Sequence, residues 1–305
     1  MFDKMPILLG QIKKTKALQL MLIPGLIYYL VFHYVPIYGL IIAFKDFNLR
    51  LGILGSQWIG LDNFKRFFNY VYFFRLVKNT FVLNLYSLLW GFPMPIILAL
   101  FLNEVKNLFF KRFVQTVSYL PHFISTVAIV GMLYMILSPS TGIVNRIIMA
   151  LGGESIYFVA DKAWFRTLYI GSGIWQSVGW GAIIYLAALS GVSDELHEAA
   201  VIDGASRVQR IFHISLPSIM PTIVIMLILN IGSMMSSSTE KVLLLYQPNT
   251  YEVSDVLGTY VYRMGLGQAD YGFGTAAGLF NSVINLALLI LANSISKKLT
   301  EKGLW

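Results

Sequence analysis

The residues of this chain that could bind or react fall into two groups. The first is a charged segment, residues 198–217, that interrupts an otherwise apolar sequence. The second is a set of amide, hydroxyl and aromatic side chains inside apolar segments. Amides both donate and accept hydrogen bonds, and an aromatic plane suits the apolar face of a pyranose ring. The second group therefore has the chemistry needed to pass a hydroxylated solute.

Several kinds of chemistry are excluded by what the chain lacks. It has no cysteine, four scattered histidines and no G-x-x-x-x-G-K-[ST] sequence. Disulfides, thiol catalysis and cysteine-based zinc sites are therefore excluded, and we expect no metal or cofactor to be bound by this chain. Without a phosphate-binding loop the chain is not expected to hydrolyse ATP. A membrane-embedded enzyme would need a nucleophile–base pair or metal cluster, which the apolar segments do not offer.

The composition predicts an integral membrane protein. Of the 305 residues, 57% are hydrophobic and 12% are charged, whereas a soluble domain has about 25% charged residues. The net charge of +8 comes from Lys and Arg at the ends of apolar segments, where they anchor helices and meet anionic lipid. Nucleic acid is not an expected partner, because no soluble basic patch carries stacking aromatics.

Six apolar stretches reach the roughly 20 residues that a membrane helix needs, which predicts an all-α integral membrane fold. They cover residues 17–44, 80–102, 114–137, 167–189, 219–236 and 273–295. The first is too long for a signal peptide and lacks a small-x-small cleavage site, so we expect it to be retained. Pro24 and Pro36 should kink it. The fifth is short and ends in the polar run 236–239.

Six spans place both termini on one side of the membrane. The terminal side holds Lys4, Lys13, Lys14, Lys16 and Lys302 among others, about half of the 23 Lys and Arg, so the positive-inside rule favours that side as the inside only weakly. The outer segments are then 45–79, 138–166 and 237–272. An aromatic stripe over 61–78 predicts an interfacial helix, with packing against neighbouring helices as the alternative. A second short outer helix is expected over 252–266.

The charged segment has the local signals of two short helices joined by a glycine. Ser193 can cap a helix that begins at Asp194, whose carboxylate favours the positive end of the helix dipole. Gly204 can end that helix in a left-handed conformation. Ser206 and Gln209 form a capping box that opens the second helix. Such a unit can seat in a groove of a soluble partner and transmit motion, and an ordinary connecting loop is the alternative.

This segment closely resembles the EAA loop of ABC-importer permeases. The resemblance covers Glu198, Ala199, Ala200, Asp203, Gly204, Ile214, Leu216 and Pro217. In that family the loop is the cytoplasmic contact through which an ATPase drives the membrane subunit. The resemblance implies that Glu198 meets a basic residue of the ATPase and that Gly204 allows the turn. It also implies cytoplasmic termini, and that ATP and Mg are used by the partner ATPase.

The wider resemblance is to sugar-importer permeases. It rests on residues 22–26, 34–36, 58–64 and 78–80, while 38–47 and 255–263 look like the oligosaccharide or polysaccharide branch found in Gram-positive bacteria. The Thr-x-Gly-Gly-Pro stretch of many sugar permeases is replaced here by residues 245–248. The resemblance implies a type I importer with a five-helix core and an additional N-terminal helix that wraps the partner. It implies a heterodimer with a second permease, two ATPase subunits and an extracellular sugar-binding lipoprotein.

Polar and aromatic residues within the spans are candidates for the substrate path, because polar groups in hydrocarbon usually face the bundle interior. They are Asn84, Trp175, Gln176, Trp180, Tyr185, Asn230, Ser233, Asn281 and Asn285. The alternative for each is an interhelical hydrogen bond or an interfacial anchor. Outside the spans, Arg146, Arg166 and Arg263 could meet a uronate.

We therefore expect a permease subunit of the cell membrane that forms half of the path for a carbohydrate, an oligosaccharide that includes acidic ones. The expected domains are 1–75 with the first helix and an outer segment, 76–296 as the transport domain, and a tail over 297–305. One alternative is a permease for another solute, such as a phosphodiester or peptide. A stand-alone channel or secondary transporter is less favoured, because ion coupling usually places ionisable residues near the midplane, and nearly all of them lie outside the predicted spans.

Overall fold

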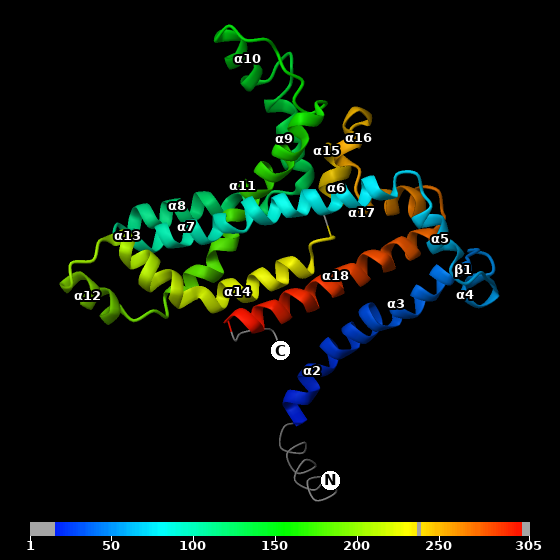
Figure 1. Ribbon diagram of the computed structural model, residues 1–305, viewed down its shortest axis with the longest axis horizontal. Helices are drawn as coiled ribbons and strands as arrows, with labels where there is room; N and C mark the ends of the chain where they lie inside the picture. The colour runs from blue at the N-terminus through cyan, green and yellow to red at the C-terminus, as the bar shows by residue number, and fades with distance from the viewer. Residues whose placement is uncertain (1–15, 237–238, 301–305) are drawn as a thin grey trace, which may run out of the picture. The chain divides into compact units, whose positions relative to one another are not determined.

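The computed structural model describes residues 16–236 and 239–300, and these divide between two compact units (Figure 1). One unit comprises residues 1–68 and 264–279, and the other comprises 69–263 and 280–305. The predicted features at Lys4, Lys13, Lys14, Ser237–Ser238 and Lys302 lie outside the described residues. The sequence-based division into 1–75, 76–296 and 297–305 stays a prediction.

The first unit begins with a helical run that confirms the first predicted span. Helix α2 (Lys16–Tyr29), a π turn (Leu30–Tyr34), α3 (Val35–Tyr38) and a 3-10 turn (Gly39–Phe44) follow one another without a break. Residues Gln19–Phe44 are long and apolar enough to cross a membrane. The π turn lies just before Pro36, whose ring cannot accept the regular carbonyl position one turn earlier.

A small polar platform follows this helix in the same unit. It consists of β1 (Lys45–Asp46), α4 (Gly52–Gly55), β2 (Gln57–Trp58) and α5 (Asp62–Phe68). The two strands pair antiparallel, with Lys45 opposite Trp58. Asn63 donates hydrogen bonds to the carbonyls of Ala43 and Lys45, at 3.0 and 3.1 Å. The predicted helix over 61–78 is therefore two helices, because α5 ends at Phe68 and α6 begins at Phe73.

The second unit contains most of the helices. The first part holds α6 (Phe73–Tyr86), a π turn (Ser87–Gly91), α7 (Pro93–Glu104), α8 (Leu108–Tyr119), a 3-10 turn (Leu120–Phe123), α9 (Thr126–Ile136), α10 (Ile143–Ala150) and α11 (Lys162–Leu189). The second part holds α12 (Asp194–Ile202), α13 (Arg207–Arg210), a π turn (Ile211–Ser215), α14 (Leu216–Gly232), α15 (Thr239–Leu245), α16 (Tyr251–Ser254) and α17 (Leu257–Val261). The last helix of the chain is α18 (Tyr271–Thr300).

Four helical runs of the described chain are long and apolar enough to span a membrane: Gln19–Phe44, Phe73–Glu104, Arg207–Gly232 and Tyr271–Lys298. They correspond to the predicted first, second, fifth and sixth spans. The fifth begins earlier than predicted, because α13, the π turn and α14 are continuous through Pro217. The fold class is therefore all-helical with several apolar helices, as expected.

The predicted third and fourth spans differ from simple apolar helices. The third, 114–137, is wrong as one continuous helix, since Leu108–Phe123 and Thr126–Ile136 meet at a bend of 101°. Pro121 and the cap of α9 by Ser125 explain the break, since both end regular helix pairing. The fourth is α11, a helix of 28 residues, roughly 42 Å long at 1.5 Å per residue. It is not among the four apolar runs.

Helix α11 is the centre of the second unit and crosses α7, α8 and α14 (Figure 1). Small residues allow this close packing: a side-chain carbon at Gly179 would overlap the carbonyl of Ser118, and one at Gly181 would lie 3.0 Å from Pro95. One hydrophobic cluster joins these helices through Ile96, Ala99, Leu100, Ala182, Tyr185, Leu189 and Ile219. The core thus fixes the helices whose polar faces are described below.

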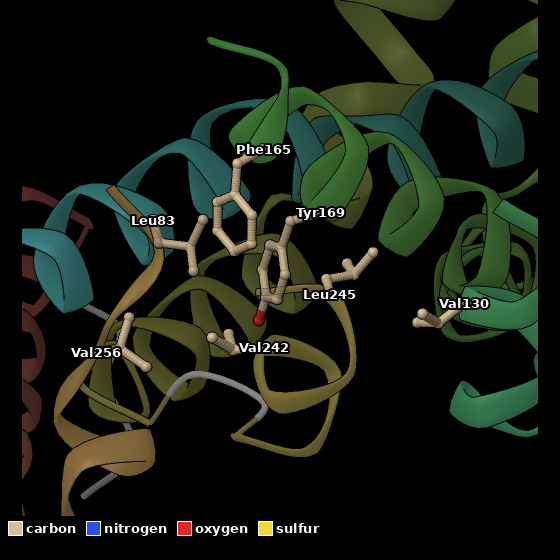
Figure 2. Close-up of a cluster of buried hydrophobic side chains, with 7 residues drawn as sticks. All are labelled: Leu83, Val130, Phe165, Tyr169, Val242, Leu245 and Val256. Carbon is tan, nitrogen blue, oxygen red and sulfur yellow. The ribbon is translucent and has the colours of Figure 1, made fainter. Parts of the chain in front are cut away.

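A second cluster holds α15 against α11. Figure 2 shows its members Leu83, Val130, Phe165, Tyr169, Val242, Leu245 and Val256. Val242 and Leu245 are the apolar residues that α15 contributes, and each is at most 1% exposed. Because they are buried beside Tyr169, the preceding turn of α15 is held next to α11. This packing decides where Lys241 lies.

Candidate functional site

A cavity of about 460 Å³ lies between α7, α11 and neighbouring segments of the second unit. Four predicted path residues line it: Gln176, Trp180, Tyr185 and Asn230. They come from two helices, α11 and α14. The structure therefore brings together at one cavity residues that lie up to 54 positions apart in the sequence.

The wall near the bend of the third predicted span contributes a stacked pair of rings. His122 and Trp180 lie with their ring centroids 4.4 Å apart and their planes at 1°. Both residues line the cavity. Gln176 donates a hydrogen bond of 3.0 Å to the carbonyl of Ile124, at the break between the two bent helices. One role of Gln176 is thus the interhelical bond that was the alternative to a path role.

Lys241 is a cavity residue that the sequence did not reveal. It is 5% exposed and lines the same cavity, although the sequence placed it in an outer segment. Its ammonium donates a 2.7 Å hydrogen bond to the carbonyl of Tyr169 and lies 4.9 Å from the centre of that ring. Burial lowers the pKa of Lys241 to about 8. The available signal was the apolar run Val242–Leu245, which predicts burial of its neighbourhood.

A smaller cavity of about 120 Å³ adjoins the ends of α6 and α14. Asn84, Asn230 and Ser233 line it, together with Ser236. Asn230 lines both cavities, and its amide donates a 2.8 Å bond to the carbonyl of Met226 in its own helix. Asn84 likewise bonds the carbonyl of Thr80 at 2.7 Å. These residues thus present polar groups to one connected region of the second unit.

The remaining predicted path residues lie elsewhere. Asn285 of α18 accepts a 2.8 Å hydrogen bond from the backbone of Met235 and donates one of 2.8 Å to the hydroxyl of Ser236. It therefore ties α18 to the chain that follows α14. Asn281, one turn earlier, has a buried side-chain oxygen without a hydrogen-bond partner among the described residues. Trp175 is 48% exposed and is not among the described residues that line either cavity.

The 194–217 segment has the local structure predicted for it. Ser193 accepts a hydrogen bond from the backbone of Glu195 at the start of α12. Gly204 has a φ of 83°, and its neighbour Ala205 donates a 2.8 Å bond to the carbonyl of Ala200. This pattern ends a helix with a left-handed residue, which favours glycine. The capping box of Ser206 is present in both directions.

The segment protrudes from one end of the second unit (Figure 1). Glu198, Ala199, Asp203 and Gly204 are exposed on it, and Ala200 is half-buried. A hollow of about 300 Å³ lies between its two helices, lined by Ala200, Ala205, Gln209, Arg210, His213 and Ile214. Leu216 packs against the hydrophobic cluster of α7 and α11, while Pro217 is exposed. One side of the segment is therefore fixed and the other is presented outward.

The outer arginines named as uronate contacts differ in their surroundings. Arg263 forms an ion pair of 2.9 Å with Asp255, whose side chain is 3% exposed. Its charge is thus used inside the protein. Arg166 lies 5.9 Å from the ring of Tyr86 and has a buried Nε without a hydrogen-bond partner. Among the described residues, no group of three or more His, Asp and Glu comes together in a way that could hold a metal.

Apolar helices around a polar cavity, with a protruding segment at one end, define a class of protein: a membrane transport subunit. The family described as "Binding-protein-dependent transport system inner membrane component" matches residues 91–301, and the chain belongs to this family. The resemblance to ABC-importer permeases is therefore confirmed.

Curated relatives and solved structures agree with this membership. "Protein LplB" of Bacillus subtilis (strain 168) is 46% identical over 97% of this chain and 93% of its own length. The "Polygalacturonan/rhamnogalacturonan transport system permease protein YteP" of the same strain is 46% identical over 99% and 94%. A chain of a crystal structure of a bacterial ABC transporter involved in the import of the acidic polysaccharide alginate is 44% identical, with a TM-score of 0.88 over 96% of this chain and 99% of that chain.

Proposed function

We propose that this chain is a permease subunit of an ATP-driven importer and forms half of the path for an oligosaccharide. The observation that carries the proposal is the cavity of about 460 Å³, lined by amides and aromatic rings between helices. Amides replace the hydrogen bonds that sugar hydroxyls lose on leaving water. The names of YteP and of the alginate importer support a carbohydrate, and an acidic one in particular.

The 194–217 segment is the proposed contact with the ATPase. Glu198 and Gly204 lie exposed on a unit whose other side is packed into the core, so motion of a docked partner would pass directly to α14. ATP and Mg would be used by two partner ATPase subunits, and this chain would hold no cofactor and do no catalysis. The segment and both termini then face the cytoplasm.

The rest of the assembly follows from the family. Six spans are proposed, with the bent pair α8–α9 and helix α11 as the third and fourth and the five later spans as the core. The first helix, whose apolar side chains are largely exposed in the single chain, would wrap a second, related permease. A sugar-binding lipoprotein would deliver the substrate outside, as a structure that contains a periplasmic protein bound to an alginate pentasaccharide suggests. A permease for another solute is the alternative.

The test compares two charge reversals of the same kind. Glu198→Lys sets a cation against the expected basic partner, whereas Glu154→Lys makes the same change at an exposed site in the proposed outer segment. We expect Glu198→Lys to reduce both co-purification of the ATPase and ATP-driven sugar uptake several-fold, and Glu154→Lys to change neither. Normal uptake by the Glu198→Lys protein would contradict the proposed contact.

A further inference from the structure

We propose that Lys241 is a specificity-determining residue whose ammonium binds the carboxylate of an acidic sugar unit inside the cavity. The inference rests on the proposed function and goes beyond it by naming the group that recognises charge. Lys241 lines the same cavity as Gln176, Trp180 and Asn230. The described lining residues include Lys241 and His122 but no Asp or Glu. The cavity therefore presents basic groups without an acidic side chain in its described wall.

The position of the ammonium is fixed by the fold. Val242 and Leu245 anchor α15 in the cluster that contains Tyr169. The Tyr169 carbonyl accepts the 2.7 Å bond from Lys241. Helix α11 also leaves room for the ammonium at Gly173, where a side-chain carbon would lie 3.2 Å from the Lys241 nitrogen. A lysine held at both its helix and its tip is suited to recognition rather than to solvation.

The physical chemistry favours an anionic occupant. A charge that is 5% exposed has lost most of its hydration, which is costly unless another charge or dipole replaces water. In such an environment the attraction between an ammonium and a carboxylate is stronger than in water. Nearby, the stacked rings of His122 and Trp180 offer an aromatic surface, and Gln176 and Asn230 bring amides. Together these groups fit a hydroxylated ring that carries a carboxylate.

The first experiment measures uptake by the complete transporter with its partner subunits and binding protein, in proteoliposomes that contain ATP. The probes are trigalacturonate and its methyl ester, which share length and ring but differ in charge. A charge-assisted hydrogen bond predicts that Lys241→Met lowers the ratio of acidic to neutral uptake about tenfold or more. Lys241→Arg should retain most of the ratio. A ratio that is unchanged in Lys241→Met overturns the proposal.

The second experiment removes the binding protein, so that its own selectivity does not contribute. The purified complex of permeases and ATPases is heated with galacturonate or with methyl galacturonate. We expect galacturonate to raise the unfolding midpoint of the wild-type complex and the ester to leave it unchanged, with no response to either in Lys241→Met. No wild-type response to galacturonate, an equal response to both sugars, or a response that survives in Lys241→Met overturns the proposal.

A second variant decides the matter if Lys241→Met fails to assemble. Gly173→Ala keeps the lysine but places a methyl group against its ammonium, whereas Gly171→Ala, on the same helix, has nothing within 4 Å. Both exchange a helical glycine for alanine, so their effects on helix propensity are alike. Gly173→Ala alone should lower the acidic-to-neutral ratio, and equal ratios in the two variants overturn the proposal. Uptake of the neutral probe without charge preference leaves the proposed function intact, whereas a wild-type complex that takes up no oligosaccharide defeats that function itself.

Discussion

Arg210 and Glu104 form an ion pair, with 3.6 Å between the guanidinium and the carboxylate. The pair joins the start of the α13–α14 helical run to the end of α7. Their side chains are only 17% and 18% exposed, so the pair is screened less than a surface contact. It is thus a direct connection between the 194–217 segment and a helix that borders the cavity.

Glu104→Gln should weaken this connection. The change leaves the half-buried Arg210 charge without its carboxylate, a cost of roughly 1–3 kcal/mol. We expect a lower unfolding midpoint of the complex and less sugar transported per ATP hydrolysed. Asp62→Asn breaks the exposed pair of Asp62 and Lys65 and serves as the control, with an expected loss of about 0–1 kcal/mol. Equal effects of the two substitutions would contradict the role given to Glu104.

Gly179→Ala should disturb the packing of α11 on α8. A side-chain carbon at Gly179 would overlap the backbone carbonyl of Ser118, which cannot move away as a flexible side chain does. Overpacking of this kind costs about 1–3 kcal/mol, and it would appear as a lower unfolding midpoint and yield. Gly171→Ala is the control, since it faces open space. A Gly179→Ala protein as stable as the control would show that the two helices separate easily.

Gly204→Ala should impair ATP-driven uptake. The φ of 83° is a conformation that costs an L-residue about 1–2 kcal/mol, and the surrounding space is open, so the effect arises from the backbone. Gly191→Ala is a control at a nearby exposed glycine that would make only an ordinary 3.5 Å contact. We expect several-fold lower uptake for Gly204→Ala with the protein still in the membrane. Normal uptake would mean that the turn tolerates strain or is not needed for coupling.

Asn285→Leu and Asn230→Leu should have different consequences. Asn285 bridges α18 to Met235 and Ser236, so its loss should lower assembly and thermal stability by roughly 1–3 kcal/mol. Asn230 lines both cavities and its printed bond lies within its own helix. Its loss should therefore reduce uptake while assembly persists. Measuring both properties on both variants would reverse the assignments if Asn230→Leu proves to be the one that does not assemble.

The sequence by itself determined the features that depend on neighbouring residues. Apolar length predicted the helices that begin at Gln19, Phe73 and Tyr271, because a membrane helix satisfies its own backbone hydrogen bonds. The cap at Ser193, the left-handed Gly204 and the box at Ser206 were predicted because each depends on residues within one turn. The EAA-like pattern around Glu198 identified the family for the same reason, as a local arrangement of side chains.

Only the tertiary structure decided which polar groups meet. Gln176, Asn230 and Lys241 come from α11, α14 and α15, and sequence spacing carries no information on contacts between different helices. The burial of Lys241 depends on Val242 and Leu245 packing beside Tyr169, 72 residues away from Lys241. The same limit explains why Asn285 was predicted as a path residue: whether an amide faces a cavity or ties two segments together is decided by what lies across from it.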